Sequence, residues 1–173
     1  TINGVTDGPS ITVSDDNGAG TTGDNSIAEN AAVAVTGTMT LSVPGGLNKI
    51  SLAGTDITEA QLLALPGIPL AGIVSADEGG TLTLTAYNAG TGVISYSYVQ
   101  AGSSKDHTAG DLTRIDSFAV TVTDDANTTS PADSLDILIT DTAPVANADS
   151  KAINENTVSV TDNVITGAAT ADT

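Results

Sequence analysis

Hydrophobic and polar side chains alternate with a period of two over most of this sequence, the pattern of β-strands that bury one face. The clearest runs are 81–86, 94–98, 118–122 and 135–139, and weaker ones lie at 11–14, 32–42 and 49–53. Seven or more short strands predict an all-β fold, an antiparallel β-sandwich. The glycine-containing loop 88–92 predicts a hairpin. Tyr96 and Tyr98 lie on an inward stripe and are expected to be packed in the core.

One segment departs from the strand pattern and predicts a short helix. Asp56 and Glu59 have the spacing of a capping box, with Asp56 as N-cap and Glu59 at the third helical position. Residues 60–65 then predict about two helical turns, ended by Pro66. A structural role at one end or edge of the sandwich is expected, and partner binding is the alternative. The wider apolar stretch 60–76 is too short and too interrupted by proline to insert into a membrane.

Composition narrows the possible partners. Hydrophobic residues make up 39% of the chain and aromatic residues only 2%, so the core must consist mainly of Val, Ile, Leu and Ala. Acidic residues number 21 and basic residues 4, which gives a net charge of −17. This charge disfavours binding to nucleic acid and to anionic membranes, and makes divalent cations the natural partner. The absence of cysteine fits a bacterial surface protein in which metal replaces disulfides.

The two ends of the chain resemble each other. A Thr-Asp corner occurs at Asp7 and again at Asp141, and each corner is followed by an Ile-x-Glu-Asn tetrad, at 27–30 and 153–156. The separation is that of a whole domain and exceeds the roughly 20–50 residues of solenoid repeats. The chain is therefore predicted to hold one complete module of a tandem array. Its expected parts are the tail of a preceding repeat (1–9), the sandwich (10–145) and the start of the following repeat (146–173).

Carboxylates collect at the ends of predicted strands and at the repeat corners. Calcium takes six to eight oxygen ligands from carboxylates, amides and carbonyls, which such corners can supply. Two carboxylates about 4 Å apart repel by about 1 kcal/mol in water, so a crowded corner favours a bound cation. Calcium is the predicted cofactor; the alternative is that these residues only form turns and keep the protein soluble. The candidate ligands are Asp7, Asp15, Asp16, Asp24, Glu29, Asp124, Asp125, Asn127, Asp141, Asp149 and Glu155.

Catalysis is not expected. His107 is the single histidine and lies in a polar loop beside Lys105. A Ser-His-Asp arrangement through Ser103 or Ser104 would lack any recognisable oxyanion hole. A glycosidase needs two converging carboxylates in a cleft, and this chain has few aromatic rings on which a sugar could stack.

Several segments together resemble the long repeats of giant type I-secreted RTX adhesins of Gram-negative bacteria. They are the hairpin 79–98, the strand 116–124 and the Asp-Thr-Ala-Pro exit at 141–144, and the similarity spans residues 10–145. The segment 146–157 resembles the start of a cadherin-like or VCBS-type repeat. The resemblance implies a calcium-dependent immunoglobulin-like or cadherin-like sandwich. Such sandwiches are strung in series outside the cell and project a ligand-binding tip.

The resemblance also implies roles for individual carboxylates. Asp7 and Asp141 would be ligands at the linkers between modules, and Glu29 and Glu155 would close those sites from the following module. Asp124 and Asp125 would line the same end of the module as these linker ligands.

The expected function is that of a calcium-stiffened extender module in adhesion or biofilm formation, located on the bacterial surface. The expected partners are neighbouring repeats and calcium, and the protein is expected to be monomeric. The alternative is a calcium-dependent module at the adhesin tip that binds a surface glycan or a peptide, with loop 100–113 as the candidate region.

Overall fold

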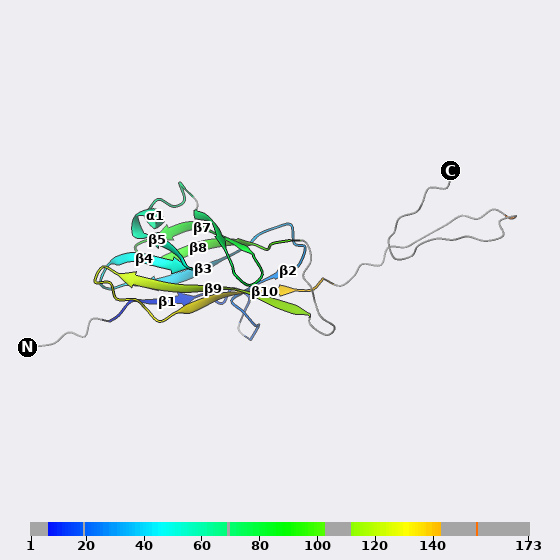
Figure 1. Ribbon diagram of the computed structural model, residues 1–173, viewed down its shortest axis with the longest axis horizontal. Coiled ribbons are helices and arrows are strands. Elements are labelled where there is room, and N and C mark those ends of the chain that lie inside the picture. The colour runs from blue at the N-terminus through cyan, green and yellow to red at the C-terminus, as the bar shows by residue number, and fades with distance from the viewer. Residues whose placement is uncertain (1–6, 19, 69, 103–111, 143–154, 156–173) are drawn as a thin grey trace, which may run out of the picture. The chain divides into compact units, whose positions relative to one another are not determined.

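The computed structural model describes residues 7–18, 20–68, 70–102, 112–142 and 155 (Figure 1). The chain forms two compact units, Thr1–Thr142 and Ala143–Thr173, and all described strands belong to the first. Several features of the sequence interpretation lie wholly or largely outside the described residues: most of the loop 100–113 with Ser103, Ser104 and His107, and the predicted start of the following repeat at 146–173 with Asp149, except residue 155.

The first unit is a sandwich of two five-stranded sheets, which confirms the predicted all-β fold with one short helix. One sheet has the order β1 (Ser10–Val13), β3 (Val35–Ser42), β8 (Val93–Val99), β7 (Thr81–Asn88) and β6 (Leu70–Val74). The other has the order β2 (Asn25–Ala28), β10 (Asp133–Thr140), β9 (Thr113–Asp124), β4 (Leu47–Leu52) and β5 (Thr55–Thr58). Neighbouring strands are antiparallel except β2 and β10, which run parallel.

The core lies between the two sheets and is formed by the predicted apolar stripes. Tyr98 of β8 and Phe118 of β9 meet across it edge to face, with ring centroids 6.0 Å apart. Tyr96 is also fully buried, so the expectation that both tyrosines pack in the core is confirmed. Removing these side chains from water is the main favourable term in folding. Further core side chains with no exposed surface are Met39, Ile50, Leu52, Leu62, Leu82, Leu84, Ile94, Val120, Val122, Leu135, Ile137 and Ile139.

The predicted helix forms, but its boundaries differ from those expected. Helix α1 spans Glu59–Leu63, and its N-cap is Thr58 rather than Asp56. The capping box joins Thr58 and Gln61: the Thr58 hydroxyl accepts from Gln61 N, and Gln61 Oε1 accepts from Thr58 N at 2.9 Å. Asp56 instead belongs to β5, which pairs with β4 as far as Thr58, and its carboxylate binds Lys49 Nζ at 2.6 Å. Strand pairing thus moves the start of the helix two residues downstream.

The chain enters and leaves the sandwich at opposite ends. Strand β9 has 12 residues and so extends for about 36 Å. At its Asp124 end, which we call the upstream end, β4 begins at Leu47 and β1 begins next to Ser42. At its Thr113 end, the downstream end, β10 finishes at Thr140. In Figure 1, β9 points toward the side on which β1 begins and β10 points the opposite way.

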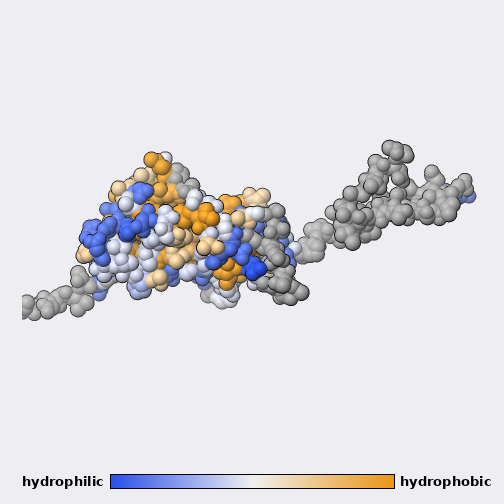
Figure 2. Space-filling model, viewed as in Figure 1, coloured by the Kyte–Doolittle hydropathy of each residue, from blue (hydrophilic) through white to orange (hydrophobic). Residues whose placement is uncertain are grey.

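Exposed large apolar side chains are dispersed over the sandwich. Figure 2 shows hydrophobic and hydrophilic residues intermingled on the face in view. Within the described residues, no helix has the length and apolar character needed to span a bilayer. The exposed large apolar residues are Val33, Leu63, Ile68, Val74, Val99, Leu112 and Ile115.

Candidate functional site

Glu29 and Asp141 come together at the downstream end, although they are far apart in the sequence. The parallel pairing of β2 with β10 sets Ala28 opposite Thr140, and Glu29 N donates to the Thr140 carbonyl at 2.8 Å. Asp141 follows directly, and its N–H donates to the Leu112 carbonyl at 3.0 Å. Glu29 is buried and Asp141 is exposed. Two of the predicted ligand residues are therefore neighbours at the point where the chain leaves the sandwich.

The acidic corner at the upstream end is a hydrogen-bonded turn. Asp124 Oδ1 accepts from Thr128 N at 2.7 Å. Asn127 has a φ of 63°, in the left-handed region that asparagine tolerates, and its Oδ1 accepts from Asn48 Nδ2 at 3.3 Å. Asp125 is exposed at the tip of the turn. Turn formation accounts for the positions of Asp124 and Asn127.

The ligand sets implied by the family resemblance need correction. Asp7 precedes β1 at the upstream end, whereas Glu29 follows β2 at the downstream end, so Glu29 does not close a site at Asp7. The pair Asp124 and Asp125 also lies at the upstream end, away from Asp141. The reason is topological: the chain crosses from one sheet to the other between β1 and β2, and β2 then runs along β10 toward its end.

The loop that crosses from β1 to β2 holds a third group of acidic residues, Asp15, Asp16 and Asp24. Each of these carboxylates accepts a hydrogen bond from a backbone N–H. Asp15 Oδ1 accepts from Gly18 N at 2.9 Å, as in an Asx turn. Asp16 Oδ2 accepts from Thr38 N at 3.0 Å, which joins the loop to β3. These contacts give Asp15 and Asp16 a structural role.

Asp24 ends the crossing loop in an anionic environment. Its Oδ2 accepts from Asp136 N at 2.7 Å. Partial burial raises the pKa of Asp24 above its usual value, and the charges of Asp136, Asp133 and Asp15 raise it further, against the effect of the backbone N–H. Ionisation of Asp24 is therefore less favourable in the folded protein than in the unfolded chain.

The donor chemistry of the downstream end fits calcium in part. Glu29 and Asp141 offer hard carboxylate oxygens, but these are fewer than the six to eight ligands that calcium takes. In the part of the chain that the structure describes, no three His, Cys, Asp or Glu residues form a group that could hold a metal ion. The other predicted ligands for this joint, Asp149 and Glu155, belong to the second unit, where Glu155 is exposed in a turn.

A buried carboxylate that sequence reasoning missed lies nearby, at Asp116 of β9. Its side chain is fully buried and accepts four hydrogen bonds. Oδ1 accepts from Ser75 Oγ and from Glu78 N at 3.1 Å. Oδ2 accepts from Tyr98 Oη at 2.7 Å and from Gly80 N at 3.0 Å. Asp116 thus fastens the loop between β6 and β7 to the core, a structural role.

The alternation itself could have identified this residue. Asp116 occupies an inward position of the stripe that continues through Phe118, Val120 and Val122. A carboxylate at a core position is rare unless it is fully paired.

The buried tyrosines make the fold sensitive to alkaline pH. Burial raises the pKa of Tyr96 to about 12, although a hydrogen bond from Asn25 Nδ2 opposes the shift. Burial also raises the pKa of Tyr98, and the hydrogen bond to Asp116 adds to the effect.

We therefore expect the free energy of unfolding to fall above pH 10. A raised folded-state pKa gives a contribution that is complete below the unfolded-state value of about 10 and is lost as the pH rises toward the folded-state value. The slope should approach about 1.4 kcal/mol per pH unit for each tyrosine. Urea unfolding at pH 8–11.5 measures it, with Tyr96→Phe expected to reduce the slope. A free energy that stays constant to pH 11 would contradict this expectation.

A comparison of the sequence with protein-family models gives no match, and no curated protein matches it. The likeness to RTX adhesin repeats therefore stays a prediction from the residues that carry it.

Proposed function

We propose that this chain is a calcium-stiffened extender module of a large bacterial surface adhesin. The proposal rests on the path of the chain. The chain enters the sandwich at the upstream end and leaves it at the downstream end, beside Glu29 and Asp141. Its place would be outside the cell, where it would hold a distal ligand-binding region away from the surface for adhesion or biofilm formation.

The path through the sandwich suits a chain of modules joined in series. Since the two ends are separated by the length of β9, each such module would add about 36 Å to the string. A module with both termini at one end would add little length. The partners of this domain are therefore its neighbours in the same chain, and a monomer suffices.

Calcium would convert the linker into a stiff joint. Glu29 and Asp141 would supply oxygens from the sandwich, and Asp149 and Glu155 would supply them from the segment that follows. Without a cation, carboxylates brought together at such a joint would repel one another, in a chain of net charge −17. Extracellular modules bind calcium with dissociation constants of about 10⁻⁴–10⁻³ M, so the joint would stay flexible in the cytosol and stiffen after export.

Isothermal titration calorimetry of the whole chain with calcium tests this proposal. We expect binding in the sub-millimolar to millimolar range, and at least tenfold weaker binding in the Glu29→Gln and Asp141→Asn variants. Asp56→Asn is the matched control, because Asp56 pairs with Lys49 and lies on β5, away from the downstream end. The proposal fails if the wild-type chain does not bind calcium, or if Asp141→Asn binds it as tightly as Asp56→Asn.

A further inference from the structure

The turn that follows β9 contains the tripeptide Asn127-Thr128-Thr129, and all three residues are exposed. Asparagine followed two positions later by serine or threonine, with no proline between them, is the acceptor motif for N-linked sugars. The motif occurs once in the chain, because no other asparagine has serine or threonine two positions later. The turn lies at the upstream end, opposite the proposed calcium joint, so the two features are independent.

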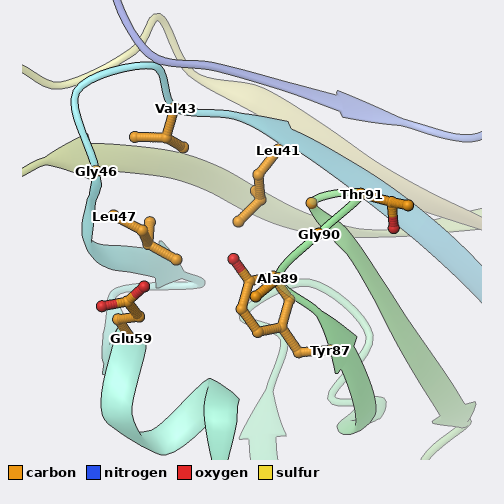
Figure 3. Close-up of a pocket in the computed structure, with 10 residues that line it drawn as sticks. Leu41, Val43, Gly46, Leu47, Glu59, Tyr87, Ala89, Gly90 and Thr91 are labelled. Atoms are coloured by element: carbon orange, nitrogen blue, oxygen red, sulfur yellow. The ribbon is translucent and has the colours of Figure 1, made fainter.

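Hydrogen bonds fix the backbone of this turn and leave the amide nitrogen of the asparagine available. Asn127 N donates to the Asp124 carbonyl at 2.9 Å, and Asp125 N donates to the Gly46 carbonyl at 3.1 Å. Figure 3 shows Gly46 in the loop between β3 and β4. The Asn127 side chain accepts from Asn48 Nδ2 through its Oδ1, and its Nδ2 has no hydrogen bond to any residue that the structure describes. The nitrogen that would carry a sugar is therefore not engaged.

The hydroxyl of the motif is also positioned by the fold. Thr129 forms a backbone bridge with Thr123 of β9, and the two hydroxyls lie 3.0 Å apart. Thr129 is nevertheless exposed, so an enzyme can reach it from solvent. The turn thus presents the asparagine and the threonine of the motif together on the surface of the folded domain.

A polar hollow of about 390 Å³ adjoins the asparagine, on the outer face of the sheet. There Lys49 and Ser51 of β4 pair with Thr123 and Thr121 of β9. The charged side chains in its lining, Lys49 and Asp56, form an ion pair and so compensate each other. The rest of the lining consists of four hydroxyl side chains and the acceptor asparagine. Hydroxyls and a compensated ion pair suit a neutral polyol better than an ion, and the volume is at the small end for ligand sites, about 300–1,000 Å³.

We propose that Asn127 is the acceptor of an N-linked glycan and that the hollow seats its first sugar. The donor is a sugar diphosphate. In the transfer, Asn127 Nδ2 forms a bond to the anomeric carbon of the sugar while the bond from that carbon to the diphosphate oxygen breaks. The diphosphate leaves with the electron pair, and one Nδ2 proton passes to a base of the transferase. The attached sugar then donates to and accepts from the hydroxyls of Ser51 and Thr121.

The test exposes the purified, folded whole chain to two transferases. One is a cytosolic N-glycosyltransferase with a nucleoside-diphosphate hexose, and the other is a membrane oligosaccharyltransferase with a lipid-diphosphate oligosaccharide. The reaction that gives product identifies the source of the sugar. We expect one glycan per chain by intact mass, assigned to Asn127 by peptide mapping. Asn127→Gln should abolish the product, Thr129→Val should lower its yield at least tenfold, and Thr129→Ser should retain most of it.

Asn88→Gln is the matched control, because Asn88 is exposed in a turn but lies outside the motif. No glycan on the folded wild-type chain with either transferase would overturn the proposal, as would an undiminished yield in a folded Thr129→Val variant. NMR of the ¹⁵N-labelled chain before and after modification tests the seat of the sugar. We expect shifts in the amides of 49–51 and 121–123; shifts confined to 124–129 would show that the sugar points into solvent and would exclude the hollow.

Discussion

Replacing Asp116 by alanine is expected to lower the free energy of unfolding by about 3–5 kcal/mol. The substitution leaves four donors without their acceptor: three are buried, the hydroxyls of Ser75 and Tyr98 and the N–H of Gly80, and the fourth, the N–H of Glu78, is partly buried. A buried donor left unsatisfied costs about 1–3 kcal/mol, and the costs add incompletely because water can enter the vacated space. The loss is large against the total stability of a domain, about 5–15 kcal/mol.

Urea unfolding of the Asp116→Ala variant, followed by circular dichroism, measures this loss. Tyr98→Phe removes one donor together with its hydrogen bond and should cost only about 1 kcal/mol. Asp125→Ala, at an exposed position, should change the free energy of unfolding by less than about 0.5 kcal/mol. A cost below 1 kcal/mol for Asp116→Ala would mean that the buried network does not hold the loop between β6 and β7.

Calcium is expected to raise the stability of the chain by about 2–3 kcal/mol. A ligand that binds only the folded form stabilises it by RT ln(1 + [L]/Kd), about 2.7 kcal/mol when the ligand is at 100 times its Kd. With a Kd of about 10⁻⁴ M, 10 mM calcium reaches that ratio. Part of the gain should come from relief of repulsion among the carboxylates, so it should exceed the effect of sodium chloride at equal ionic strength.

Parallel urea titrations with 10 mM calcium and with EGTA test this expectation. Glu29→Gln should lose most of the calcium-dependent gain, which is measured against the same variant in EGTA; its backbone bond to Thr140 is retained in both conditions. Asp56→Asn should keep the whole gain. Equal urea unfolding midpoints with calcium and with EGTA in the wild-type chain would show that calcium does not stabilise it.

The fold could be predicted from the sequence where the alternation is long. The stripes at 81–86, 94–98, 118–122 and 135–139 each became a strand of the sandwich. The strands that the sequence did not reveal, β2, β5 and β6, are only four or five residues long, too short for a period of two to stand out. They form because a longer neighbour offers them hydrogen bonds, which is a tertiary effect.

The candidate site was less predictable because it depends on which strand lies beside which. Glu29 and Asp141 were both proposed as ligands, but only the parallel pairing of β2 with β10 reveals that they belong to the same end. Several other acidic residues of the sandwich accept backbone N–H groups instead, and Asp15 and Asp124 do so within turns. The same side-chain oxygens of Asp and Asn accept hydrogen bonds in turns and coordinate metal ions, so composition alone does not separate these two roles.

The most direct test of calcium stiffening is a distance measurement across the joint. The chain contains no cysteine, so spin labels attach only at introduced positions, here Thr40→Cys on the exposed face of β3 and Thr157→Cys in the segment that follows. Double electron–electron resonance should give a narrow distance distribution with calcium and a broad one with EGTA. Asp141→Asn should make the distribution broad under both conditions, whereas Asp125→Asn should behave as the parent chain does. The same distribution with and without calcium would contradict the proposal that calcium stiffens this module's connection to the next.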